Sequence, residues 1–315
     1  MRRSASPLSL TLLGLGVFLL VLAPMLAFYV EPRAKRTPVD VNTTTVMTGT
    51  GTYFDRGSVS AREDQELTVT RRVLGNVAVS TENDVAVWDV SVTIDTPDTL
   101  KLDDPRKSFQ WTTERWVTDR ETNKPVHCCD EAPTQFSGDA YLKFPFDVRE
   151  RSYRWWDNTL GDTVTMEFDK RVKLDGYEGL RFTGEVAPTQ VDTRQVPGVL
   201  VGVDAPQVMA EEWYANENIE LVVDETTGRI LKATSAPDIT LRAPGGEEPQ
   251  VTLLYSDALT FTDETIESQI DLASADSRKL RLVGTTAPVG AAIAGVVLTG
   301  AGGFLVVRGR REPQP

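Results

Sequence analysis

The chain has 315 residues, a net charge of −13, two cysteines and one histidine. This length leaves room for one large domain or two small ones beside membrane spans. Because basic residues cluster at the two ends, the middle is more acidic than the chain as a whole. An acidic middle repels nucleic acid and anionic lipid surfaces and attracts cations, so we expect no nucleic-acid partner. A solvated, soluble surface is its simplest interpretation.

Two uncharged apolar runs bracket the acidic middle, residues 8–30 and 282–307. A helix of roughly 20 apolar residues crosses a bilayer core of about 30 Å, so both runs are predicted transmembrane helices. The first run is longer than the apolar core of a signal peptide and lacks a clear cleavage site, which favours an anchor. We expect the helix of the second span to begin at Pro288, with Thr286 as its N-cap.

The second run carries small residues at four-residue spacing, namely Gly290, Ala291, Ala294, Gly295, Thr299 and Gly303. Small residues let another helix approach closely. The partner helix is either the first span, where Ala23 and Ala27 repeat the spacing, or another copy of the chain, which would make a homo-oligomer. The alternative is a single span that tolerates Gly and Ala without a partner.

These features predict a division of the chain into seven segments. They are a cytoplasmic N-terminus 1–7, a transmembrane helix 8–30, a tether 31–52, an acidic extracytoplasmic β domain 53–260, a juxtamembrane helix 261–281, a transmembrane helix 282–307 and a basic cytoplasmic tail 308–315. Basic residues flank both spans on both sides, so the charge rule alone does not orient them. Long domains translocate largely regardless of charge, and we therefore place the domain outside the cytoplasm.

Strand signals dominate the middle and predict a mainly β fold, an antiparallel sheet of about ten short strands. Val77–Val79, after Gly75-Asn76, is predicted to be part of a strand, and Ala140–Phe146 alternates like a strand. One face of the 85–94 segment has the composition of a core surface, with Ala86, Trp88, Val90, Val92 and Ile94. The only soluble helix is expected from Asp263 to about Ala275, capped by Thr262.

An internal similarity relates two hairpins: Trp116–Val126 aligns without gaps on Leu221–Leu231. The shared Asp can bond the backbone of its own turn, and Asn123 or Gly228 can adopt positive φ. The repeat favours two related hairpin units and a duplicated sheet. Chance similarity of two common hairpins is the alternative.

The sequence His127-Cys128-Cys129-Asp130 is the one cluster that looks like a chemical site. Four consecutive residues cannot easily surround a metal tetrahedrally, and no second Cys or His cluster completes the shell, so we predict no metal site. A disulfide between Cys128 and Cys129 is favoured over free thiols or intermolecular pairing. The sequence lacks the familiar nucleophile, phosphate-loop and metalloprotease motifs, so we predict no catalytic residue, no cofactor and no enzymatic activity.

Tyr153, Trp155 and Trp156 follow Phe144–Phe146 closely. Aromatic side chains at this density can face a ligand cleft or stack on sugars. Packing inside a β domain is the more common role, and it is favoured here.

Several of these features together resemble a known family. They are the two apolar ends, Gly51–Asp55, Phe144–Phe146 followed by Tyr153, Trp156 and Asp157, and the hairpin Val223–Arg229. The chain resembles, over nearly its whole length, an actinobacterial family of envelope proteins long labelled a domain of unknown function and now called PorA-type porins. The resemblance implies a channel in the cell envelope, cation-selective in keeping with the acidic domain. It supplies no catalytic residues.

Three functions remain open. The first is a membrane-anchored envelope protein whose acidic domain binds or scaffolds other envelope components. The second is a channel; because the strands are short and charged, it would require oligomerised helices and not a β-barrel. The third is lipid or lipoprotein handling by a curved sheet, which predicts a deep apolar pocket. The expected partners are the lipid bilayer, a second copy through the C-terminal span, and an envelope protein or lipid.

Overall fold

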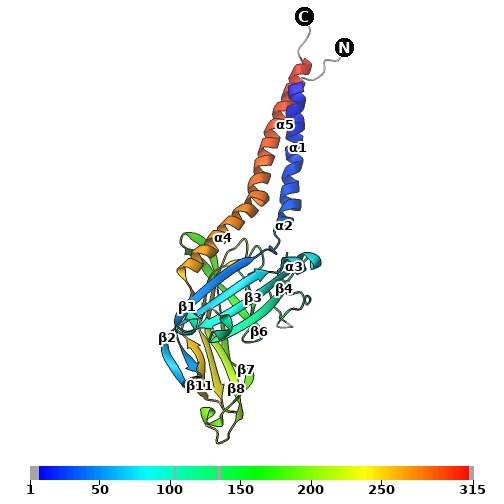
Figure 1. Ribbon diagram of the computed structural model, residues 1–315. Coiled ribbons are helices and arrows are strands. Elements are labelled where there is room, and N and C mark those ends of the chain that lie inside the picture. The colour runs from blue at the N-terminus through cyan, green and yellow to red at the C-terminus, as the bar shows by residue number, and fades with distance from the viewer. Residues whose placement is uncertain (1–6, 103, 133–135, 312–315) are drawn as a thin grey trace. The chain divides into compact units, whose positions relative to one another are not determined.

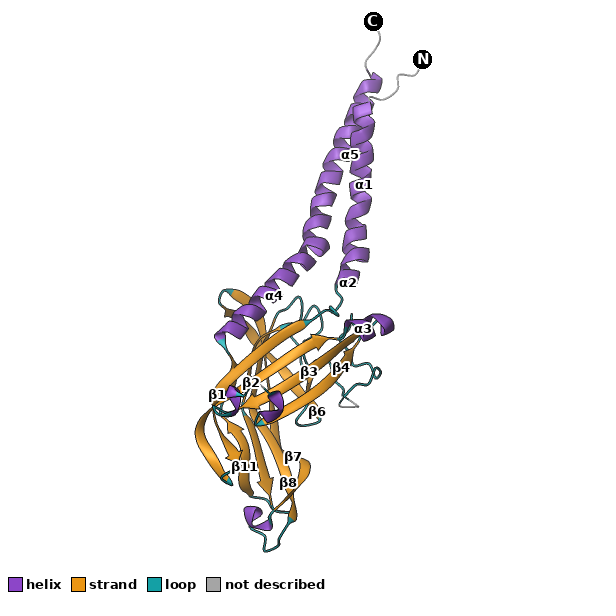
Figure 2. Cartoon of the chain, viewed as in Figure 1, coloured by secondary structure: helices purple, strands orange, loops and turns teal. Residues whose placement is uncertain are grey.

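The computed structural model describes residues 7–102, 104–132 and 136–311. They form two compact units (Figures 1 and 2). One unit is a β domain, Thr37–Ala273. The other is helical and takes the chain up to Arg36 and from Ser274 onward.

The helical unit consists of two helical stretches, each interrupted by a π-helical turn. The first contains α1 (Pro7–Met25), the π turn Leu26–Val30 and α2 (Glu31–Ala34). The second contains α4 (Asp263–Arg281), which begins in the β domain, the π turn Leu282–Thr286 and α5 (Ala287–Arg311). Both stretches are long and apolar enough to cross a membrane.

The predicted helix start at Pro288 is wrong, because Thr286 lies inside the π turn of a helix that is already running. In both stretches a proline stands two residues after the π turn, Pro32 in the first and Pro288 in the second. A proline removes one backbone donor and its ring collides with the carbonyl four residues earlier. The wider π turn relieves that collision, so the helix continues where we expected it to begin.

The β domain contains twelve strands in one antiparallel sheet among the described residues. The strands are β1 (Asn42–Asp55), β2 (Ser60–Gly75), β3 (Ala86–Asp95), β4 (Gln110–Thr118), β5 (Tyr153–Asp157), β6 (Asp162–Leu174), β7 (Tyr177–Val196), β8 (Val208–Val223), β9 (Ile230–Ser235), β10 (Pro237–Arg242), β11 (Pro249–Ser256) and β12 (Leu259–Phe261). A short helix, α3 (Val77–Asn83), connects β2 to β3.

The sheet is built from two meanders joined through β1. Its order is β4-β3-β2-β1-β11-β10-β8-β7-β6-β5. One residue separates β9 from β10, and both pair with β8. In the same way β11 and β12 both pair with β1. The strands β9 and β10 therefore act together as one long, interrupted strand, and so do β11 and β12.

The sheet curls until its two outer strands meet. Trp116 of β4 and Trp156 of β5 lie at opposite ends of the strand order, yet their ring centroids are 6.4 Å apart. The segment between these strands closes the remaining gap, with bridges from Ala132 to Arg115 and from Ala140 to Trp155. An aromatic core fills the interior.

The mainly β prediction is confirmed, and so is the core face of β3. Ala86, Trp88 and Val90 are buried in the main core, and Val92 and Ile94 pack against it.

The predicted strands are too short, because β7 has 20 residues and β2 and β8 have 16 each. Three local predictions also differ from the structure. The tether 31–52 is too long, because β1 begins at Asn42 and pairs in register with β2. Its Thr-rich start suits a half-buried strand without showing apolar alternation. Val77–Val79 is helical, since the Asn76 side chain accepts a hydrogen bond from Val79 N. Residues 140–146 form no strand: only Ala140 makes a bridge, and Tyr141 and Phe144 are buried in the core.

Candidate functional site

The two apolar helices pack through small residues at seven-residue spacing. Ser9, Gly16 and Ala23 are the buried residues of α1. On α5 the buried positions are Pro288, Gly295 and Gly302. A spacing of seven keeps one face of a helix against its neighbour in a left-handed pair. The first apolar helix is therefore the partner of the second within the chain.

The helices run antiparallel and bring their backbones close together. A side chain placed on Gly295 would meet Leu20 Cγ at 2.9 Å, with Gly16 O and Leu20 N at 3.0 Å. One placed on Gly302 would meet Leu13 N at 2.6 Å and Ser9 O at 3.0 Å. Glycine is needed at both positions because the neighbouring atoms are mostly backbone.

Of the six helix-packing residues predicted from the sequence, Gly295 and Thr299 contact α1. Ala291 and Ala294 are half-buried. Gly290 and Gly303 have open space where a side chain would stand. The four-residue spacing therefore identified part of the contact face. The seven-residue spacing of small residues in both apolar helices would have identified the rest.

The two related hairpin turns have the same geometry. Asp119 N donates to Lys124 O at 2.8 Å, and Asp224 N donates to Arg229 O at 2.8 Å. Each Asp side chain accepts the backbone N–H of the Thr three positions later at 2.7 Å. The residue after that Thr has positive φ in both turns, 59° at Asn123 and 73° at Gly228. The resemblance ends there, because β9 follows the second turn but only a bridge at Pro125 follows the first.

One short segment is held by both turns. Asn123 Nδ2 donates to Lys143 O at 2.9 Å, and Phe144 N donates to Gly228 O at 2.7 Å. The aligned positions 123 and 228 thus bind consecutive residues. These two hydrogen bonds fix the backbone of Lys143 and Phe144.

Two arginines lie near Lys143. We call Arg120, Lys143 and Arg229 the basic cluster. Arg120 Nε donates to Thr37 O at 3.1 Å, and Thr37 N donates to Arg120 O at 2.7 Å. Lys143 Nζ lies 3.5 Å from Thr37 Oγ1 and 3.8 Å from the ring centroid of Phe146. Desolvation, and then the nearby charge of Arg229, lower the pKa of Lys143 to about 7.

The three aromatic residues that were candidates for facing a ligand are core residues. Tyr153, Trp155 and Trp156 are only 3%, 8% and 4% exposed. The Phe144 ring contacts both Tyr153 and Trp155, with centroids 5.1 and 5.7 Å away. These three side chains pack the interior and do not face a ligand cleft.

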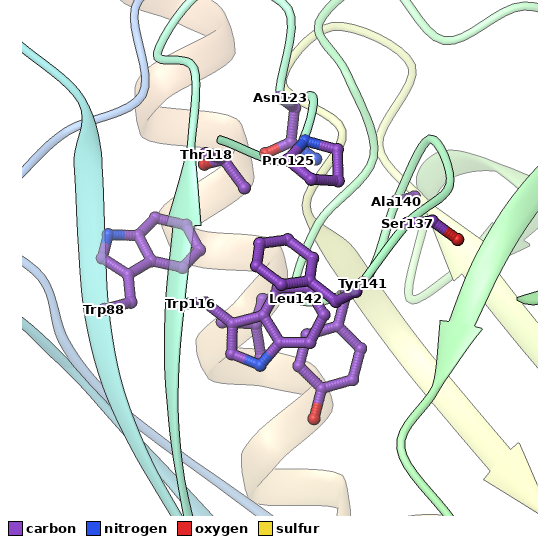
Figure 3. A pocket seen from close by; sticks show the side chains of 10 residues that line it. Trp88, Trp116, Thr118, Asn123, Pro125, Ser137, Ala140, Tyr141 and Leu142 are labelled. Carbon is purple, nitrogen blue, oxygen red and sulfur yellow. The ribbon is translucent and has the colours of Figure 1, made fainter. Parts of the chain in front are cut away.

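A small cavity remains among neighbouring aromatic side chains. Trp88, Trp116 and Tyr141 lie around it with Leu142 and Pro125 (Figure 3). Its volume is about 20 Å³, which is room for about one water molecule. A cavity of this size cannot shelter an acyl chain, so it gives no support to lipid handling.

A buried carboxylate organises the aromatic core. Glu114 accepts hydrogen bonds from Trp116 Nε1 at 2.9 Å and from the Tyr141 hydroxyl at 2.6 Å through one oxygen. Its other oxygen accepts from Asn158 Nδ2 at 2.8 Å. Burial raises the pKa of Tyr141, so the phenol stays protonated and donates. Buried polar networks whose hydrogen bonds are all satisfied make a core more rigid. The sequence analysis did not single out Glu114 because carboxylates are so abundant in this chain.

A half-buried carboxylate, Asp157, lies at the end of β5. Asp157 accepts from the Tyr214 hydroxyl at 2.8 Å and from the amides of Thr159 and Leu160 at 2.9 Å. Desolvation raises its pKa. These contacts tie the β5–β6 turn to β8.

The described part of the His127 loop is built around a disulfide. Cys128 and Cys129 form a disulfide and pack beside Val117. His127 Nδ1 lies 2.8 Å from Glu131 Oε1, and the imidazole is 60% exposed. Across the described part of the chain no group of three or more His, Cys, Asp or Glu is placed to hold a metal ion.

An open acidic hollow lies beside β6, β7 and β8. Its volume is about 690 Å³, and Glu167, Glu185 and Glu217 line it together with several Thr residues. Of the residues that the structure describes, no lysine or arginine lines this hollow. A cationic partner would meet a concave acidic surface here, and no local sequence pattern indicated it.

Comparison with known proteins identifies the family. A family model described as porin PorA matches residues 8–304. No curated protein matches the chain. The match spans both apolar helices and the whole β domain, in keeping with a membrane protein. The chain therefore belongs to the porin PorA family.

Proposed function

We propose that this protein is anchored by two membrane spans and presents its β domain outside the cytoplasm, where the domain binds or scaffolds other components of the cell envelope. The packing of α1 against α5 carries the proposal. Small residues close the two helices onto each other, and residues 8–30 and 282–307 carry no charge. Such a pair suits an anchor because it offers lipid an apolar surface and has no charged face to line a pore.

Binding would use the acidic hollow on the domain. Three carboxylates without a lining cation among the described residues attract a positively charged partner. The proposal does not include enzymatic activity, since the buried carboxylates of the described residues, Asp95, Glu114 and Asp224, all accept structural hydrogen bonds.

A second candidate function is a cation-selective channel formed by several copies. The family supports it, and so do Gly290, Gly300 and Gly303, which leave open space on α5 for another helix. This function requires stable oligomers.

Planar-bilayer conductance of the purified full-length protein separates the two functions. The control is a variant that lacks residues 282–315. The anchor proposal predicts no conductance from folded, inserted protein. Reproducible cation-selective steps that disappear in the control would refute it in favour of the channel.

Cysteine labelling of intact cells tests the orientation. Arg56, in the exposed β1–β2 turn, and Arg308, at the end of the second span, are each replaced by cysteine. A membrane-impermeant maleimide should label Arg56→Cys and spare Arg308→Cys. The reverse pattern would place the β domain in the cytoplasm.

A further inference from the structure

The basic cluster is a positively charged site in an otherwise acidic domain. We propose that Arg120, Lys143 and Arg229 bind the phosphate group of an anionic membrane lipid. This site is independent of whether the domain scaffolds or conducts.

Lys143 is a basic residue with no counterion among the described residues. The structure places no carboxylate of the described residues within ion-pair distance of its ammonium. Its neighbours are a hydroxyl oxygen of Thr37 and the ring of Phe146. A half-buried ammonium that lacks a carboxylate gains from an incoming anion, because the anion offsets the desolvation of the charge.

The neighbouring charges favour an anion as well. Arg229 lies close enough to lower the pKa of Lys143. Arg120 shares Thr37 with Lys143, and it pairs with Asp84 at 3.5 Å, a carboxylate whose side chain is largely exposed. Guanidinium groups bind phosphate through paired N–H donors, and lysine adds a point charge.

The place of the cluster in the chain favours a lipid as the source of the phosphate. Thr37 follows the first helical stretch by only three residues, since α2 ends at Ala34. Arg229 donates to Gln269 of α4, the helix that leads to the second span. The cluster therefore contacts the first residue after the first connection, Thr37, and a residue of α4 within the β domain, Gln269. Basic residues next to a span attract anionic headgroups.

Native mass spectrometry of the full-length protein in neutral detergent tests the site. The probes are short-chain phosphatidylglycerol, phosphatidylcholine of equal chain length, and inorganic phosphate. Wild type should prefer phosphatidylglycerol, and Lys143→Gln should weaken that binding at least about tenfold, because the central charge is lost. Lys143→Arg should stay within about threefold of wild type, because it keeps that charge.

Lys173→Gln is the matched control, since it removes the same charge from an exposed lysine on β6. It should bind as wild type does. Equal affinity for the two lipids, or wild-type affinity in Lys143→Gln, overturns the site. If inorganic phosphate binds as tightly as phosphatidylglycerol, the lipid assignment is wrong.

A second measurement needs no variant. Brief acetylation of wild type near neutral pH, followed by peptide mass spectrometry, reports the reactivity of each lysine. Phosphatidylglycerol should protect Lys143, since a bound phosphate holds the proton on its amine, and should leave Lys173 unchanged. Equal acetylation of Lys143 with both lipids refutes the proposal even if the variants do not fold.

Discussion

Replacing Gly295 with alanine should weaken the pairing of α1 and α5. The added methyl group would stand 2.9 Å from Leu20 Cγ and 3.0 Å from two backbone atoms, so the helices must move apart to admit it. The matched variant is Gly300→Ala, further along α5, where nothing lies within 4 Å. Both variants gain the same helix propensity, up to about 1 kcal/mol, which cancels between them.

The remaining difference is the steric cost, which we expect to be about 1–3 kcal/mol. Förster transfer between dyes on Leu8→Cys and Phe304→Cys measures it in mixed micelles of increasing SDS content. These positions are 63% and 64% exposed, so the dyes do not enter the interface. Gly295→Ala should lose transfer at a lower SDS fraction than Gly300→Ala. Identical midpoints would show that the two helices do not pack through Gly295.

Three further predictions concern the β domain. Glu114→Gln should lower the free energy of unfolding by about 2–3 kcal/mol, because the amide group cannot accept from all three donors; urea titration followed by tryptophan fluorescence measures it, and unchanged stability would contradict it. The pKa of Lys143 is lowered from 10.5 to about 7, so the folded state binds fewer protons than the unfolded state between these values and stability should rise with pH across them. Lys143→Met should reduce that rise, and parallel stability–pH curves for variant and wild type would refute it. Without reductant, iodoacetamide should leave Cys128 and Cys129 unmodified, whereas two added groups by intact mass would exclude the disulfide.

The fold was predictable where local pattern and burial agree. The alternation of apolar residues in β3 predicted a core face, and Ala86, Trp88 and Val90 do lie in the core. The start of β1 escaped prediction because a polar, Thr-rich run shows no alternation: residues Asn42–Thr45 form a strand through their pairing with β2. Such pairing is non-local and cannot be seen in a window of sequence.

The candidate site, too, was predictable only in part. The turns at Asn123 and Gly228 were predictable from Asp, Thr and positive-φ residues, which act within a few positions. The gathering of Arg120, Lys143 and Arg229 was not, because residues far apart in the chain meet only once the sheet has curled. The sequence alone therefore predicted the two turns, but it did not predict the basic cluster that lies beside them.

The packing of the helices also constrains any channel in this family. Each chain supplies two helices long and apolar enough to cross a membrane. The small residues that could line a narrow passage, Gly16 and Gly295, are already in contact with each other. The side chains that face outward from α5 include Val296, Val297 and Phe304, which are apolar. A narrow lumen lined by such residues excludes water and closes by dewetting. An oligomeric pore must therefore either separate α1 from α5 or conduct through its acidic domains, and Gly295→Ala distinguishes these routes because only the first requires the Gly16–Gly295 contact to open.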